Sequence, residues 1–426
     1  MSALHDKLKS IFPAVREDIS RLVADHGDKV ISEVTVAQAY GGMRGVKCMV
    51  CDTSVVDPVK GLILRGRPLS ELTDRKPEEI FFLLLTNELP SKAELEDLEA
   101  DLARRAELPG YVIEALRSQP RSAHPMAMFS MGILMLEEQS KFRARYNEGM
   151  PRDAYWEAAL DDSLDLIAKL PALAAAVYRI RYELGDLIPW NPKLDWSANL
   201  PHMMGVPDES GNLGDLMRLY LTLHADHEGG NVSANLCHTA GSALSDPYYA
   251  VSAGLNGLAG PLHGLANQEC LRFHLAVRDN FNGVPNKEQL TKYAWDLLNS
   301  GRVIPGFGHA VLRSTDPRYT ALHEFAQRCC PDAEMVRIAK LMYETIPGIL
   351  TEHGKAKNVN PNVDALSGVL LYTFNVTQPR FYTAIFGVSR ALGMLAQLII
   401  NRAMGTPITR PKSVSTAWIK GQVGVR

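Results

Sequence analysis

The stretch DDSLDLIAKLPALAAAVYRIRYEL, residues 161–184, decides the fold class of this chain. Its apolar side chains recur at intervals of three and four residues, which is the spacing of an α-helix. Pro171 lies near the middle and predicts a break or a kink, because proline cannot donate the backbone hydrogen bond of a helix interior. The stretch therefore predicts a long helix of the core.

Helical spacing extends over most of the chain, so the fold class is predicted to be mainly α. Segment 214–231 is expected to be an amphipathic helix that ends at Gly229-Gly230, since glycine commonly follows a helix C-terminus. Alternation typical of strands is confined to about residues 46–65, which predicts a small β element near the N-terminus. Further helices are expected at 77–90, 286–301 and 321–330.

The composition sets limits on the class of protein. The chain has 426 residues, 46% of them hydrophobic, so it can bury a large core in two or three domains. The net charge of −3, without a basic tract, gives no sign of a nucleic-acid or membrane-surface partner. The run ALGMLAQLII, residues 391–400, is expected to be a buried helix, because it is too short to span a bilayer. Residues 1–22 mix acids and bases without an apolar stretch, so neither a secretory signal nor an uncleaved transit peptide is expected.

The six cysteines are expected to be reduced residues of an intracellular protein. Cys48 and Cys51 form a C-x-x-C pair, which is a pattern of zinc sites and of redox proteins. A structural zinc site needs a second pair of ligands at motif spacing, and none is evident in the sequence. A metal is therefore not expected at this pair.

His263 stands among small residues in GLAGPLHGLANQE, residues 257–269. The residues after it predict a helix, and the positive end of a helix dipole keeps a nearby imidazole neutral. A neutral imidazole can donate a hydrogen bond to a developing oxyanion. Taken alone, the pattern favours the alternative of a buried structural histidine.

A second polar cluster lies in RVIPGFGHAVLRSTDPRY, residues 302–319. A glycine-rich turn followed by His309, Arg313 and Arg318 suits an anionic ligand, because arginine binds carboxylates and phosphates in bidentate fashion. The glycine spacing fits neither the P-loop nor the dinucleotide-binding fingerprint. The alternative is a surface turn with solvated arginines.

His224 and His227 are three residues apart in HADHEGGNVSAN, residues 224–235, and would share one face of the predicted helix. With Asp226 or Glu228 they could hold a metal, although no third ligand is obvious. A histidine that contacts a ligand at a helix end, or a capped helix end, explains the stretch as well.

Two further stretches add a carboxyl group and a guanidinium group to the set. Asp364 precedes an apolar helical run in NVDALSGVLL; a buried acid has a raised pKa and suits a general base, whereas the alternative is a helix N-cap. Arg390 lies in the apolar helix FGVSRALG and requires an anionic partner, either a protein carboxylate or a substrate carboxylate. Together these residues suit acid–base chemistry on a small polycarboxylate.

These five stretches resemble the citrate synthase family, of the dimeric type found in mitochondria and in some bacteria, and the resemblance extends over about residues 30–415. The resemblance implies a mostly helical homodimer that acts in the tricarboxylic acid cycle. It also implies a large domain, residues 1–264 with 370–426, and a smaller mobile domain, residues 265–369.

The resemblance implies a role for each site residue. Asp364 would take a methyl proton from acetyl-CoA, His263 would donate to the thioester oxygen, and His309 would polarise and protonate the oxaloacetate carbonyl. Oxaloacetate would contact His227, Arg318, Arg390 and, from the other subunit, Arg410. CoA would contact Arg44, Arg152, Arg313 and Lys357 through its phosphates and the backbone around Ile304, Gly306 and Ala310 through its adenine. No metal and no cofactor is implied, since acetyl-CoA is a substrate.

Two residues depart from the family's pattern: Phe307 stands where tyrosine is usual, and Leu366 stands where histidine is common. The nearest alternative is 2-methylcitrate synthase, which uses propionyl-CoA, because one methylene changes binding by only about 1–3 kcal/mol. A metal-dependent hydrolase built on His224 and His227 and a non-catalytic scaffold are more distant alternatives. The region 66–80 looks shorter than in mitochondrial members, and no presequence is evident. We therefore expect a bacterial cytoplasmic protein, with a mature mitochondrial-matrix form as the alternative.

Overall fold

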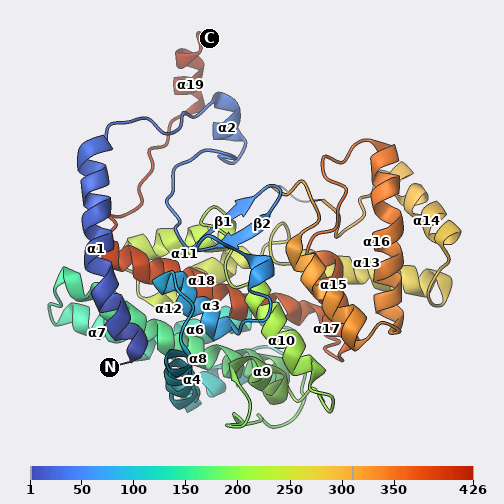
Figure 1. Cartoon of the computed structure of the whole chain (residues 1–426), viewed down its shortest axis with the longest axis horizontal. Helices are drawn as coiled ribbons and strands as arrows, with labels where there is room; N and C mark the ends of the chain where they lie inside the picture. The colour runs from blue at the N-terminus through green and yellow to red at the C-terminus, as the bar shows by residue number, and fades with distance from the viewer. Residues whose placement is uncertain (1, 309–310, 426) are drawn as a thin grey trace.

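The computed structural model describes residues 2–308 and 311–425, and most of them are helical (Figure 1). The elements of the first half are α1 (Ala3–His26), α2 (Val36–Tyr40), β1 (Ser54–Asp57), β2 (Gly61–Leu64), β3 (Arg67–Pro68), η1 (Leu69–Glu71), α3 (Pro77–Thr86), α4 (Lys92–Arg105), α5 (Gly110–Arg117), α6 (Pro125–Leu136), η2 (Glu137–Gln139), α7 (Lys141–Asn147), η3 (Arg152–Ala154) and α8 (Tyr155–Arg181). Those of the second half are α9 (Trp196–Met204), α10 (Asn212–Leu223), α11 (Val232–Ser242), α12 (Pro247–Leu258), α13 (Ala266–Phe281), α14 (Lys287–Asn299), α15 (Pro317–Cys329), α16 (Glu334–His353), α17 (Asp364–Thr373), η4 (Pro379–Phe381), α18 (Tyr382–Met404) and α19 (Thr416–Gln422). The prediction of a mainly α fold with a small N-terminal β element is confirmed.

Helix α18 forms the centre of the larger helical body and packs against α3, α8, α11 and α12. Together with η4 it covers Pro379–Met404, a helix long and apolar enough to cross a membrane by length and composition. However, 89% of its most apolar window is buried inside the protein, as in the core helix of a globular domain. The run 391–400 thus lies in a buried helix, as predicted. The helix that contains it is long enough to span a bilayer, however, so the argument that the run is too short to do so was wrong.

Helix α8 runs without interruption from Tyr155 to Arg181, with Pro171 inside it. The predicted break was therefore wrong. Pro171 is buried, and α8 packs against α9 and α18 along its length. This packing offsets the backbone hydrogen bond that proline removes.

Helix α10 ends at Leu223, so the predicted helix over 214–231 was wrong over residues 224–231. His224 closes the helix and its Nδ1 lies 2.8 Å from the carbonyl oxygen of Tyr220. The chain then turns away irregularly, and Glu228 adopts a left-handed backbone conformation with φ of 55°. His224 and His227 consequently do not share a helix face.

The three strands form one antiparallel sheet in the order β1-β2-β3, with Ser54 opposite Leu64. Residues 46–53 have no strand structure, so the predicted β element begins later than expected. The turn between β1 and β2 contacts the loop before α15: the carbonyl oxygens of Pro58 and Val59 accept from the Arg313 N–H and the Ser314 hydroxyl, each at 2.8 Å. The hairpin therefore ties a distant part of the chain to the larger body.

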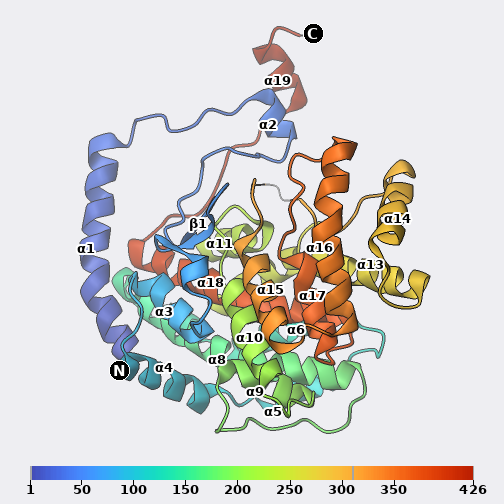
Figure 2. The ribbon, with the colours of Figure 1, turned by 45° about the vertical axis from the view of Figure 1, so that its right-hand side comes forward.

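Helices α13 to α17 pack chiefly against one another and lie together on one side of the molecule (Figure 1). Helix α15 also contacts α10 and η1. On another side, α2 and α19 stand clear of the helical body and close to each other in both views (Figures 1 and 2). They are joined by a hydrogen bond of 2.9 Å from the Tyr40 hydroxyl to Thr416 Oγ1.

Candidate active site

His263 lies in the turn between α12 and α13, three residues before α13 begins. Its Nε2 accepts a hydrogen bond from the Ser233 N–H at 3.4 Å and lies 3.0 Å from Ser233 Oγ, in the first turn of α11. Burial, followed by the nearby charge of Arg390, lowers the pKa of His263 to about 4. The imidazole is therefore neutral at neutral pH, as expected, but the helix whose N-terminus it meets is α11 rather than α13.

Arg390 is buried in α18, with 2% of its surface exposed, and its guanidinium faces the same end of α11. Its Nε donates to the carbonyl oxygen of His224 at 3.1 Å, and its Nη1 reaches Asn231 Oδ1 at 3.3 Å. Burial lowers its pKa to about 10, so it remains charged at neutral pH. None of the ion pairs found between described residues involves Arg390. A buried cation without a carboxylate at contact distance can bind an anion.

Asp226 anchors the loop between α10 and α11. It is 1% exposed, and its carboxylate accepts from Thr53 Oγ1 (2.5 Å), Ser54 Oγ (2.8 Å), the His227 N–H (2.9 Å) and Gln397 Nε2 (3.0 Å). Sequence reasoning had considered Asp226 as a neighbour of a metal. Its oxygens are instead occupied by donors from β1, α18 and its own loop, so it fixes the backbone of His227.

His224 and His227 do not form the metal site that their spacing suggested. The His224 ring is buried, is stacked on Tyr220 at 4.2 Å between centroids, and has a pKa lowered to about 3, first by burial. Within residues 2–308 and 311–425, no three His, Cys, Asp or Glu side chains are grouped so that they could hold a metal ion. Cys48 and Cys51 are free thiols, the first of them exposed.

Asp364 is the first residue of α17, and its own N–H donates to Asn362 Oδ1 at 3.0 Å. Its side chain caps nothing, so the N-cap alternative was wrong. Burial raises the pKa of its carboxyl group to about 6, against the lowering effect of the Arg318 charge. A carboxylate with this pKa is ionised at neutral pH yet basic enough to accept a proton.

Arg318 lies in the first turn of α15 with 6% of its surface exposed, so it is not a solvated surface arginine. Its Nε and Nη2 donate to the Asp316 carboxylate at 3.0 Å and 2.8 Å. Its charge acts on Asp364 and also on Arg390. His263, Arg390, Arg318 and Asp364 are therefore members of one electrostatic cluster, although they come from three helices and a turn.

The glycine-rich loop lies against the start of α17. Gly306 and Gly308 have φ of 85° and 92°, and a Cβ on Gly306 would lie 2.6 Å from Cys270 Sγ. The site thus requires glycine at 306 for both conformation and space. Ile304, the neighbouring predicted contact of adenine, is buried. The predicted residues His309 and Ala310 lie outside the residues that the structure describes.

The remaining predicted contacts are exposed basic residues. Arg313 and Lys357 flank the glycine-rich loop and the segment before α17. Arg152 lies in η3 beside α7, and Figure 1 shows α7 and α14 at opposite ends of the long axis. Arg44 lies in the segment that carries α2, and Arg410 in the extended segment between α18 and α19.

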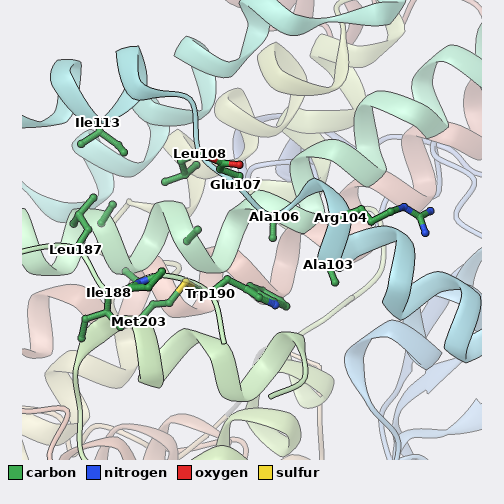
Figure 3. Close-up of a pocket in the computed structure, with 14 residues that line it drawn as sticks. Ala103, Arg104, Ala106, Glu107, Leu108, Ile113, Leu187, Ile188, Trp190 and Met203 are labelled. Carbon is green, nitrogen blue, oxygen red and sulfur yellow. The ribbon is translucent and has the colours of Figure 1, made fainter. Parts of the chain in front are cut away.

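A cavity of about 480 Å³ lies elsewhere, between α4, α5, α8 and α9 (Figure 3). Its lining is largely apolar and includes Leu108, Ile113, Trp190 and Met203, with Arg104 and Glu107 among the polar groups. None of the predicted site residues lines it. We therefore assign the candidate active site to the electrostatic cluster and not to this cavity.

Comparison with known proteins identifies the family of this chain. Residues 42–412 match the family model described as "Citrate synthase, C-terminal domain". The chain belongs to the citrate synthase family. It is 50% identical to the mitochondrial citrate synthase of Saccharomyces cerevisiae, over 98% of this chain and 89% of that protein. It is 46% identical to the mitochondrial 2-methylcitrate synthase of Yarrowia lipolytica, over 99% of this chain and 93% of that protein.

A solved structure has the same fold as this chain. The ternary complex of carboxymethyl coenzyme A and oxaloacetate with the citrate synthase of Thermoplasma acidophilum has a TM-score of 0.75, 24% identity, and coverage of 90% of this chain and 96% of that one. The prediction of a citrate synthase, an acyltransferase, is confirmed by the family and by the relatives.

Proposed function

We propose that this enzyme condenses acetyl-CoA with oxaloacetate through Asp364, His263 and His309 and hydrolyses citryl-CoA to citrate and CoA. One observation carries the assignment: two titratable groups of one cluster have pKa values shifted in opposite directions, Asp364 up to about 6 and His263 down to about 4. Groups whose environments separate their pKa values in this way are suited to complementary acid–base roles.

The first step is removal of a methyl proton of acetyl-CoA by the Asp364 carboxylate. The electrons of the C–H bond move onto the thioester oxygen, where His263 stabilises the enolate. Because His263 Nε2 accepts from the Ser233 N–H, its proton resides on Nδ1, which donates to that oxygen. One such donor lowers a barrier by roughly 3 kcal/mol.

The second step joins the enolate carbon to the carbonyl carbon of oxaloacetate, while His309 gives a proton to the carbonyl oxygen. His227, Arg318 and Arg390 hold the oxaloacetate carboxylates, together with Arg410 of a second chain. Water then cleaves the thioester of citryl-CoA and releases citrate and the CoA thiol. No cofactor takes part, and activity after treatment with a chelator tests that expectation.

The assembly that we propose is a homodimer. Helices α6, α11 and α12 are neighbours and present large exposed apolar side chains: Leu134, Met135, Val232, Leu236 and Tyr249. Apolar patches of this kind are typical of an interaction surface. Sedimentation at low salt and at high salt tests the dimer.

Residues 265–369, which include α13 to α16 and the first part of α17, are proposed to form the smaller domain that moves against the rest. Their packing on one another supports this division. Small-angle scattering with and without oxaloacetate tests the movement.

The compartment that we propose is the mitochondrial matrix. The two relatives described above are named mitochondrial, and these names lend no support to the expected bacterial cytoplasm. Fractionation of cells that produce the chain tests the location.

The test of the reaction is thiol release from acetyl-CoA with and without oxaloacetate, beside propionyl-CoA. Oxaloacetate-dependent release that is faster with acetyl-CoA supports citrate synthesis. Faster release with propionyl-CoA favours 2-methylcitrate synthesis, the activity named for the Yarrowia relative. No release with either substrate contradicts the proposal.

A further inference from the structure

Asn362 uses each of its polar groups at the junction between the glycine-rich loop and the start of α17. Its backbone N–H donates to the Gly306 carbonyl oxygen at 2.9 Å, and its Nδ2 donates to the Gly308 carbonyl oxygen at 2.8 Å. Its Oδ1 accepts from the Asp364 N–H at 3.0 Å, and its carbonyl oxygen accepts from the Ala365 N–H at 3.1 Å. One side chain thus bonds both to the residue before His309 and to Asp364.

Further contacts between the two segments lie beside this junction. The Gly308 N–H donates to the Asn360 carbonyl oxygen at 2.9 Å, and Phe307 and Pro361 form an antiparallel bridge. These contacts use backbone atoms and survive a change of the Asn362 side chain. The Nδ2 bond of Asn362 to the Gly308 carbonyl oxygen is a side-chain link between the segments that can be removed separately.

We infer that Asn362 is a positioning residue that couples the start of α17, which carries Asp364, to the loop that leads into His309. The inference rests on the proposed function, in which these two groups act on different reactants. The base must meet a methyl hydrogen of acetyl-CoA while the acid meets the carbonyl oxygen of oxaloacetate. A misplacement of about 1 Å between such groups can cost about a hundredfold in rate.

Two variants separate the two bonds. Asn362→Ala removes both side-chain bonds. Asn362→Ser keeps an oxygen that can accept from the Asp364 N–H, as serine does at helix N-termini, but it is too short to reach the Gly308 carbonyl oxygen. The matched control is Asn360→Ala, because the Asn360 side chain donates to Asn358 Oδ1 within its own segment.

Two reactions report on the two groups. Exchange of the acetyl-CoA methyl hydrogens with D₂O, in the presence of the non-condensing dicarboxylate malate, requires the base without the acid. Condensation with oxaloacetate requires both. We expect Asn362→Ala to slow both reactions about tenfold to a hundredfold. We expect Asn362→Ser to slow condensation as much while methyl exchange stays close to the wild-type rate.

The inference is overturned if both variants condense at the wild-type rate. It is also overturned if Asn362→Ser slows exchange as much as condensation, or if Asn360→Ala reproduces the effect, since either result means a general structural role. If Asn362→Ala does not fold, Asn362→Ser alone decides. Absence of oxaloacetate-dependent thiol release from the wild-type chain would instead contradict the proposed function.

Discussion

The two walls of the candidate site are held in different ways. The first wall is the loop 224–231 with α18, where the buried carboxylate of Asp226 accepts four hydrogen bonds from three parts of the chain. The second wall consists of residues 304–308 and 311–316 laid against 358–364, and it is joined mainly by backbone hydrogen bonds and by asparagine side chains. The first wall belongs to the core, whereas the second is a pair of loops laid together.

This difference separates two tasks. A buried carboxylate that loses a donor retains a desolvation cost of about 1–3 kcal/mol, so the backbone around Asp226 has little freedom. The loops of the second wall are tied to each other by backbone hydrogen bonds, and their link to the larger body includes the turn at Pro58. We therefore expect the first wall to hold oxaloacetate through His227 and Arg390, and the second to carry Asp364 as one unit with the loop that leads into His309.

The largest expected effect is the loss of the base on the second wall. Asp364→Ala should lower kcat about 10²–10⁴-fold, because general base catalysis contributes that much. Oxaloacetate affinity should change little, since the first wall remains intact. Thiol release and calorimetric titration with oxaloacetate measure the two quantities.

The matched control for this variant is Asp296→Ala, which removes an exposed carboxylate from α14 of the same helical group. It should leave both quantities unchanged. A loss of oxaloacetate affinity as large as the loss of rate would mean that Asp364 supports Arg318 and does not take the proton.

The next largest effect should come from crowding the first wall. A Cβ on Gly393 would lie 2.5 Å from Asp226 Oδ1 and 2.6 Å from the Ala225 carbonyl oxygen. Overpacking of this kind typically costs about 1–3 kcal/mol, and here it displaces the loop that carries His227. Gly393→Ala should therefore lower both oxaloacetate affinity and the free energy of unfolding, measured by titration and by urea unfolding.

Gly348 in α16 offers the comparison, because an added Cβ there meets nothing within 4 Å. Gly348→Ala should leave affinity unchanged and stabilise the chain by up to about 1 kcal/mol, as alanine does in helix interiors. Equal behaviour of the two variants would show that the first wall is not tightly packed.

The sequence predicts much of the fold but little of what holds the first wall. Periodicity identifies α14, which buries one face along its length, and the long apolar stretch identifies α8, which is buried on nearly all sides. It places the end of α10 too late, since the pattern cannot show that His224 turns back onto Tyr220. It also extends the β element over 46–53, where the alternation is present but no partner strand lies beside it.

The site shows the same limit. His263 was expected to be neutral because of the helix that follows it, yet the contact that holds its ring comes from Ser233, 30 residues earlier. Asp226 gives no local signal of its role, because its donor Thr53 is 173 residues away in the sequence. Hydrogen bonds between distant segments depend on tertiary packing, which no local spacing contains.

A smaller effect tests whether the first wall is complete within one chain. Arg410 is exposed on the segment between α18 and α19. If it reaches the oxaloacetate site of a second chain, Arg410→Ala should weaken oxaloacetate binding about tenfold, the value of one charge-assisted hydrogen bond. Mixing Arg410→Ala with Asp364→Ala should restore activity in hybrid dimers. No restoration would place Arg410 outside the partner's site.

The smallest expected effect is a shift of the acidic limb in the pH dependence of kcat/KM. This shift distinguishes the contributions of the two walls. Asp364 acts as a carboxylate and has a pKa of about 6, so kcat/KM should be constant above about pH 7 and fall about tenfold per pH unit well below 6. His263, with a pKa of about 4, stays neutral through most of this range. The limb therefore reports on the second wall.

Asp316→Asn should move this limb to lower pH, because the charge of Asp316 raises the pKa of Asp364 while that of Arg318 lowers it. Asp226→Asn, on the first wall, should reduce oxaloacetate affinity but leave the limb in place, since Asp226 acts on Arg390. The measurement is kcat/KM from about pH 5 to pH 8 for both variants and the wild type. A limb that moves upward in Asp316→Asn, or equally in both variants, would belong to a group other than Asp364. Movement in Asp316→Asn alone means that the base titrates on the second wall independently of the wall that holds oxaloacetate.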